Sequence, residues 1–200
     1  MLTLILSFLL LLTPADVLVR LKEGNARFTQ DKLEHPDRTS DRREETAPRQ
    51  SPFAVILGCS DSRIPPEIVF DQGIGDLFVV REAGNVVSEI ELESILFSVV
   101  TNQSSLVVVL GHENCGAVQA VVQKNTQSIP EIAELIQKAL TQQKVQGELT
   151  VEKAVLANIR YTVDKLKQNR TIASYIQQNR VKVVGGYYHL ESGKVEFLDI

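Results

Sequence analysis

Three short runs of apolar residues are the strongest constraint on what this chain can fold into. Residues 53–57 (FAVIL), 77–80 (LFVV) and 106–110 (LVVVL) contain no charged side chain. Continuous apolar runs of this length are typical of strands that are buried on both faces of a parallel sheet. Helical patterns separate the runs, so helical crossovers would join the strands. The sequence therefore predicts an α/β fold with a central, mainly parallel β-sheet flanked by helices.

Helical patterns also precede and follow these runs. Thr13 can cap a helix over residues 14–28, and a Ser-x-x-Glu capping box that begins at Ser88 predicts a helix over residues 88–100. Residues 30–52 are polar and interrupted by prolines, so they are expected to form an extended loop or arm. Further helices are predicted over residues 64–70, 116–124, 130–143, 149–169 and 171–179, and a C-terminal β-hairpin over residues 181–190 and 195–198.

The size and charge of the chain limit its class. Its 200 residues, 44% of them apolar, are enough for one domain with a buried core. The 21 basic and 25 acidic residues leave a net charge of −4, which gives no basic surplus for binding nucleic acid. The chain divides into an apolar N-terminal segment (residues 1–12), an N-terminal helix and arm (13–52) and an α/β domain (53–200).

The first twelve residues leave the cellular compartment open. The segment MLTLILSFLLLL is apolar at ten of twelve positions. It has the length of the apolar region of a signal peptide but lacks the preceding Lys or Arg, so it is either a signal remnant or a helix that packs on the body or a partner. It is shorter than the roughly 20 residues of a membrane-spanning helix, so no integral membrane span is expected. The protein would be cytoplasmic or exported to a periplasm.

Both cysteines of the chain follow predicted buried strands. Cys59 comes directly after the first run and Gly58, and Cys115 follows the third run in a turn that contains His112. Ligands of open α/β sheets bind beyond the carboxyl ends of strands, so these three side chains are expected at one edge of the sheet. Two thiolates and an imidazole suit zinc and leave a fourth position for water or substrate. A disulfide, two core thiols and a Cys–His nucleophile remain the alternatives.

Asp61 and Arg63 follow Cys59 in the same loop, where their side chains can face the same way. A carboxylate and a guanidinium form a bidentate pair, and Arg63 would lower the pKa of Asp61 so that the carboxylate only accepts hydrogen bonds. Such an acceptor can orient a water on a metal, or Asp61 can itself close the site as a fourth ligand. The plain alternative is that the pair only staples the loop.

Taken together, these residues resemble the motifs of the β-class carbonic anhydrases. CSDSR at residues 59–63 is similar to the first metal motif of that family, and HENCG at residues 112–116 to the second. GDLFVVREAGN at residues 75–85 resembles the strand and turn between them. The resemblance extends from about Thr13 to the C-terminal hairpin, and three motifs in this order are far more specific than one short pattern.

The resemblance implies a role for each motif residue. Cys59, His112 and Cys115 would bind one zinc ion per chain. Asp61 and Arg63 would form the catalytic dyad that governs the fourth position, with Asp61 as an additional ligand in a closed state.

A substrate pocket is also implied by the resemblance. Gln50 falls at the position of a pocket glutamine that is often lent across a dimer interface, Phe78 at an apolar wall, and Gly116 where a backbone N–H lies near the substrate. Phe97 stands where many relatives have a tyrosine, and Ile56 where the bicarbonate-inhibited subgroup has a tryptophan. We therefore expect the open form of the site, in which Asp61 pairs with Arg63.

The implied function is that of a zinc-dependent carbonate dehydratase. Zinc-bound hydroxide would hydrate carbon dioxide reversibly to bicarbonate and a proton, in a homodimer or higher homo-oligomer. Two other functions remain open: a hydrolase of carbon disulfide or carbonyl sulfide on the same scaffold, and a structural zinc protein used for assembly. The fold alone does not decide among them.

Overall fold

A five-stranded sheet in the order β2-β1-β3-β4-β5 forms the centre of the molecule. The computed structural model describes residues 13–198 and 200, so the expectations for residues 1–12 lie outside the described part. Strands β1 to β4 are parallel, and β5 pairs antiparallel with β4, which confirms the mainly parallel sheet and the C-terminal hairpin. The strands are β1 (Ala54–Gly58), β2 (Leu77–Arg81), β3 (Leu106–His112), β4 (Lys182–Tyr188) and β5 (Val195–Leu198).

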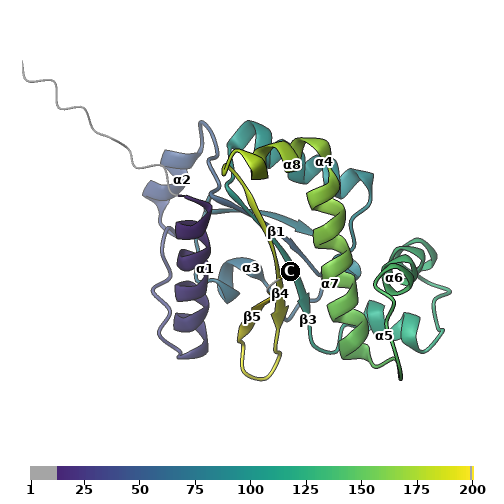
Figure 1. Cartoon of the computed structure of the whole chain (residues 1–200). Helices are drawn as coiled ribbons and strands as arrows, with labels where there is room; N and C mark the ends of the chain where they lie inside the picture. The colour runs from purple at the N-terminus through teal and green to yellow at the C-terminus, as the bar shows by residue number, and fades with distance from the viewer. Residues whose placement is uncertain (1–12, 199) are drawn as a thin grey trace, which may run out of the picture.

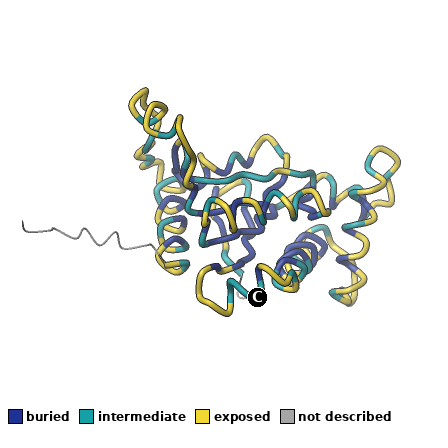
Figure 2. The backbone as a smooth tube through the Cα atoms, turned by 90° about the horizontal axis from the view of Figure 1, so that it is seen from above, coloured by how far each residue is buried: buried dark blue, intermediate teal, exposed yellow. Residues whose placement is uncertain are grey.

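Helices cover both faces of this sheet. Figure 1 shows α1 on one side of the sheet and α7, with α5 and α6 beyond it, on the other. Every residue of β1 and β3 is buried, as expected for strands covered on both faces, and Figure 2 shows the buried backbone at the centre of the molecule. The helices are α1 (Pro14–Thr29), α2 (Ser40–Thr46), α3 (Pro66–Val69), α4 (Glu89–Phe97), α5 (Gly116–Val122), α6 (Pro130–Gln142), α7 (Val151–Gln168) and α8 (Arg170–Gln177).

The predicted helix starts are confirmed by their caps. The Thr13 side chain accepts from the backbone N–H of Asp16, whose carboxylate reaches back to the Thr13 backbone, and Pro14 occupies the first turn of α1. Ser88 and Glu91 form the second capping box, at the start of α4. These pairs satisfy backbone N–H groups that have no partner inside a helix.

Two segments differ from the sequence-based expectation. The arm over residues 30–52 contains the short helix α2, which begins because the Thr39 side chain caps the N–H of Arg42. No residue of α2 is buried, so the sequence has no apolar periodicity there that would predict a helix. The helix expected to reach Val100 is α-helical only to Phe97 and continues as a π-helical turn over Ser98–Asn102.

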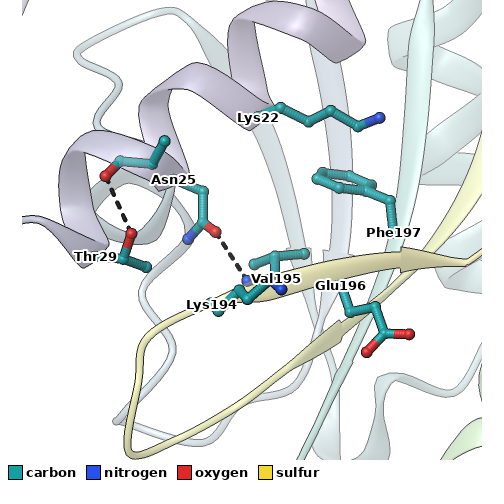
Figure 3. Close-up of a pocket in the computed structure, with 8 residues that line it drawn as sticks. Lys22, Asn25, Thr29, Lys194, Val195, Glu196 and Phe197 are labelled. Carbon is teal, nitrogen blue, oxygen red and sulfur yellow. Dashed lines mark hydrogen bonds between the residues drawn. The ribbon is translucent and has the colours of Figure 1, made fainter.

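Helix α1 is tied to the opposite end of the chain by one buried side chain. Asn25 donates from Nδ2 to the carbonyls of Val69 (3.1 Å) and Gly193 (2.8 Å), and its Oδ1 accepts from the Val195 N–H at 2.8 Å. Figure 3 shows the last of these bonds beside the hollow between α1 and β5. Through these bonds, Asn25 joins the first helix to the C-terminal hairpin.

Buried carboxylates hold the arm against the body. Asp71 is fully buried, and its carboxylate accepts from Arg27 Nε at 2.6 Å and from the backbone N–H groups of Glu34 and His35 at 3.0 Å. Burial opposes ionisation of Asp71, but these donors outweigh it and hold its pKa below the usual range. The charged pair therefore fixes the chain that leaves α1.

A second carboxylate, Asp76, is 5% exposed and lies 3.3 Å from Arg20 and 3.4 Å from Arg42. Here burial dominates and raises the pKa of Asp76.

Among the described residues, no helix combines the length and the apolar character needed to cross a membrane.

Candidate metal centre

The carboxyl ends of β1 and β3 bring the two cysteines and one histidine together. Cys59 directly follows β1, and His112 is the last residue of β3, the neighbouring parallel strand. Cys115 stands immediately before α5, three residues beyond His112. Their ligand atoms lie within 4.8 Å of one another, and all three side chains are buried. The strand was expected to end at Leu110 with His112 in a turn; the ladder to β4 instead continues to His112, which pairs with Tyr188.

His112 presents one ring nitrogen to the cluster. Its Nδ1 lies 2.8 Å from the backbone carbonyl of Glu113, an arrangement that makes Nδ1 the donor and leaves the lone pair on Nε2. Nε2 is buried and has no hydrogen-bond partner within residues 13–198 and 200. An unpartnered buried acceptor is costly, and coordination of a metal by Nε2 removes that cost. The donor set thus fits a metal ion.

The two thiols are free, and each one affects the ionisation of the other. Cys59 and Cys115 are unbridged, so the disulfide alternative is not what the structure holds. A hydrogen bond from Cys115, together with the Gly84 N–H at 3.3 Å, lowers the pKa of Cys59 to about 4. The same hydrogen bond, together with burial, raises the pKa of Cys115. A cation bound by both sulfur atoms would require loss of the Cys115 proton, since the ligand form of cysteine is the thiolate.

Asp61 and Arg63 form the pair that the loop sequence predicted. The Asp61 carboxylate accepts from Arg63 Nε at 2.9 Å, Nη2 at 2.7 Å and the backbone N–H at 3.0 Å. These bonds to Arg63 lower the pKa of Asp61 to about 2. Asp61 Oδ2 also lies 3.9 Å from His112 Nε2, so the carboxylate borders the cluster while it remains bound to Arg63.

Sequence reasoning missed the residues that hold this loop from outside. Arg81, at the end of β2, donates to the backbone carbonyls of Cys59 (2.9 Å) and Asp61 (2.6 Å). Asn158 on α7 donates to the carbonyl of Gly84 at 2.7 Å. Arg81 and Gly84 lie in the quoted 75–85 segment, which offered a signal, but nothing in the pattern of α7 singled out Asn158.

The three expected pocket residues come from three separate segments of the chain. Gln50 is exposed in the segment between α2 and β1. Phe78 on β2 packs against Phe97, with ring centroids 6.3 Å apart. Gly116 begins α5 next to Cys115, and a Cβ added there would meet no atom within 4 Å. Gly116 is thus the neighbour of Cys115 in the chain, whereas Gln50 and Phe78 come from other segments. The hollow between α1 and β5 (Figure 3) has no metal ligand in its lining.

Comparisons with known proteins identify the family of this chain. The carbonic anhydrase family model matches residues 54–195. The carbonic anhydrase of Mycolicibacterium smegmatis is 37% identical over 183 residues, which are 88% of this chain and 89% of that protein. The solved structure of the β-carbonic anhydrase CcaA superposes with a TM-score of 0.72 and 25% identity, over 92% of this chain and 88% of that one.

A likeness to a more distant structure extends to the fold alone. One of two tetrameric β-carbonic anhydrases from Sordaria macrospora has a TM-score of 0.67 and 20% identity, over 92% of this chain and 98% of that one. The family match covers both metal motifs and the strands that carry them. This chain belongs to the β class of the carbonic anhydrases.

Proposed function

We propose that this chain hydrates carbon dioxide reversibly to bicarbonate and a proton, the reaction of its family, at one zinc ion held by Cys59, His112 and Cys115. The observation that carries the proposal is the buried cluster of these three ligand atoms within 4.8 Å of one another. Two sulfur atoms and one nitrogen are the ligand types that zinc prefers, and three protein ligands are typical of catalytic zinc.

When bound, zinc supplies Lewis-acid activation of water, whose pKa falls from 15.7 to about 7 in the carbonic anhydrases with three histidine ligands. The protein supplies orientation. Because Arg63 keeps Asp61 ionised, its carboxylate can only accept a hydrogen bond, and it lies 3.9 Å from His112 Nε2. Asp61 would therefore accept a hydrogen bond from a water held beside His112, and so orient the oxygen lone pair of that water toward the substrate.

The first residue of α5 offers a place for the substrate oxygen. Gly116 follows Cys115 directly, and the space that a side chain would occupy there is open. We propose that the Gly116 N–H donates to an oxygen of carbon dioxide or bicarbonate. A residue with a side chain would narrow the approach to the ligands, so glycine suits this position.

A second copy of the chain would complete the pocket. Phe78 and Phe97 pack together at the β2 edge of the sheet. Helix α4 and its π-helical continuation carry exposed apolar side chains, namely Ile90 (73% exposed), Phe97 (50%) and Val100 (45%). Such a surface favours association with another subunit. We propose that the chain forms a homo-oligomer, as the tetrameric enzyme of Sordaria macrospora does, and that Gln50 and Phe78 serve the site of the partner subunit.

The proposal is tested on the purified chain by zinc analysis combined with stopped-flow measurement of carbon dioxide hydration. We expect one zinc per chain, loss of hydration after treatment with a chelator, and recovery when zinc is added back. A chain that hydrates carbon dioxide without metal contradicts the proposal. A zinc-loaded chain that releases hydrogen sulfide from carbonyl sulfide but does not hydrate carbon dioxide identifies the alternative hydrolase.

A further inference from the structure

Helix α7 contributes a buried amide to the surroundings of the metal site. Asn158 is 1% exposed, and its Nδ2 donates to the carbonyl oxygen of Gly84 at 2.7 Å. The two residues are 74 positions apart in the chain. A buried amide that donates to a loop carbonyl fixes the position of that loop relative to the helix.

Gly84 in turn contacts the metal ligand. Its N–H donates to Cys59 Sγ at 3.3 Å, and its φ of 73° is a conformation that favours glycine. A Cβ at this position would lie 3.1 Å from Ile136 and 3.3 Å from Ala117, so the backbone is held closely against α5 and α6. The direction of the N–H toward sulfur therefore depends on contacts to Gly84 from three helices.

The same turn of α7 also fixes the strand that carries His112. A Cβ added to Gly111 would lie 2.7 Å from Ile159 and 3.1 Å from Val155, which shows how closely α7 approaches β3 just before the ligand. Asn158 lies between these two residues in the helix. One turn of a long, buried helix thus contacts both the loop that donates to Cys59 and the residue beside His112.

We propose that Asn158 is a positioning residue for the metal ligand Cys59: by holding Gly84, it aims a backbone N–H at the Cys59 sulfur and sets its alignment with His112. The inference rests on the proposed metal site. Hydrogen bonds to a ligand sulfur withdraw electron density from the metal–sulfur bond and orient the sulfur. Loss of the Asn158 bond releases the Gly84 carbonyl, and the N–H loses its alignment on Cys59.

The chain offers a matched control in Lys165, two turns further along α7. Its Nζ donates to the carbonyl of Val87 at 2.9 Å, so it also joins α7 to the segment that follows β2. No bond links Val87 to a metal ligand in the described part of the chain. A general loosening of this segment follows from either substitution, whereas a change at the sulfur follows only from substitution of Asn158.

The experiment compares Asn158→Leu and Lys165→Met with the unmodified chain. Zinc affinity is measured by competition with a chromophoric chelator, and the cobalt(II) form is examined for its sulfur-to-cobalt charge-transfer band. We expect zinc affinity to fall about 10- to 100-fold in N158L, the size of effect seen when partners of metal ligands are removed, with a displaced charge-transfer band. K165M should match the unmodified chain in both measurements.

Thermal unfolding of the metal-free proteins separates this effect from loss of the fold. If N158L does not fold, Asn158→Asp measured at pH 8.5 replaces it, because the N158D carboxylate has no N–H to donate. Unchanged zinc affinity and an unchanged cobalt band in a folded Asn158 variant overturn the proposal, as does an equal loss of affinity in K165M. If the unmodified chain binds neither metal through sulfur, the proposed metal site fails instead, and the two failures are thereby distinguished.

Discussion

Two regions of this molecule each contain an aspartate–arginine ion pair, and the two pairs have different functions. At the carboxyl edge of the sheet, Asp61 and Arg63 are two residues apart, and their side chains are 17% and 53% exposed. Beneath the N-terminal arm, Asp71 is fully buried and its partner Arg27 comes from a helix 44 residues away. One pair shapes a single loop beside the proposed metal site, and the other joins two distant segments.

The difference shows that reach and burial decide what an ion pair does. Asp61 keeps contact with solvent and lies beside His112, so its charge is available to a ligand. The Asp71 carboxylate accepts hydrogen bonds from Arg27 and from two backbone N–H groups, and its side chain has no exposed surface. Exposed pairs add little stability, whereas a buried charge that loses its partner is strongly destabilising.

The metal side of the comparison is tested most severely by removing a ligand. Cys59→Ser, His112→Ala or Cys115→Ser should abolish zinc binding and reduce carbon dioxide hydration by roughly a thousandfold or more, because water loses its activating ion. Zinc content and stopped-flow rates measure both effects. A folded C115S protein with full zinc content and full turnover would show that the three ligands are assigned wrongly.

On the arm side, Arg27→Met should lower the free energy of unfolding by about 3 kcal/mol, since Asp71 stays buried without its cation. Turnover per folded molecule should remain that of the unmodified chain, because Arg27 lies outside the ligand cluster. Urea unfolding and zinc-normalised rates check the two statements. A variant that keeps its stability would remove the distinction drawn between the two pairs.

The reverse pattern is expected for Asp61→Asn. Zinc should remain bound, and the stability should change by less than about 1 kcal/mol, because Arg63 is largely exposed. Turnover should fall about 10- to 100-fold, since an amide can donate as well as accept and no longer fixes the orientation of water. If the variant hydrates carbon dioxide at the unmodified rate, the assignment of the dyad is wrong.

The smallest effects separate the two buried carboxylates from each other. The native pKa of Asp71 is below 3.8, so folded protein binds its proton less tightly than the unfolded chain, and falling pH through this range favours unfolding. The native pKa of Asp76 is raised, so falling pH there favours the folded state.

Unfolding free energies between pH 2 and pH 6 reveal these opposite slopes. Relative to the unmodified chain, Asp71→Asn should be least stable near pH 6 and recover as the pH falls. Asp76→Asn should show the opposite trend: its free energy of unfolding, relative to that of the unmodified chain, should decrease as the pH falls. Parallel curves for the two variants would contradict the different electrostatic surroundings of the two carboxylates.

Local signals account for what the sequence predicted well. The apolar runs became β1, β2 and β3, and the caps at Thr13 and Ser88 begin helices because their partners lie three residues away. Short α2 was missed because a helix with no buried residue carries no apolar period. The ends of α4 and β3 differ from those predicted, α4 becoming π-helical at Ser98 and β3 continuing to His112. Pairing with distant residues, such as that of His112 with Tyr188, sets such an end and is not visible in the local sequence pattern.

The site divides in the same way. The ligand cluster and the Asp61–Arg63 pair were accessible because each motif is short and follows a strand end. Asn158 was not, because its bond to Gly84 spans 74 residues and depends on how α7 lies across the sheet. Gln50 and Phe78 remain predictions, since their proposed roles require a second copy of the chain.

The bond network of Asn25 also imposes an order on the making of the protein. Helix α1 finds hydrogen-bond partners at Gly193 and Val195, 168 and 170 residues later in the chain. At ribosomal rates of about 5–20 residues per second, these partners emerge roughly 10 to 30 s after Asn25 itself. For that interval the apolar face of α1 lacks its last neighbours, and exposed apolar surface of this kind favours aggregation until the final hairpin has formed.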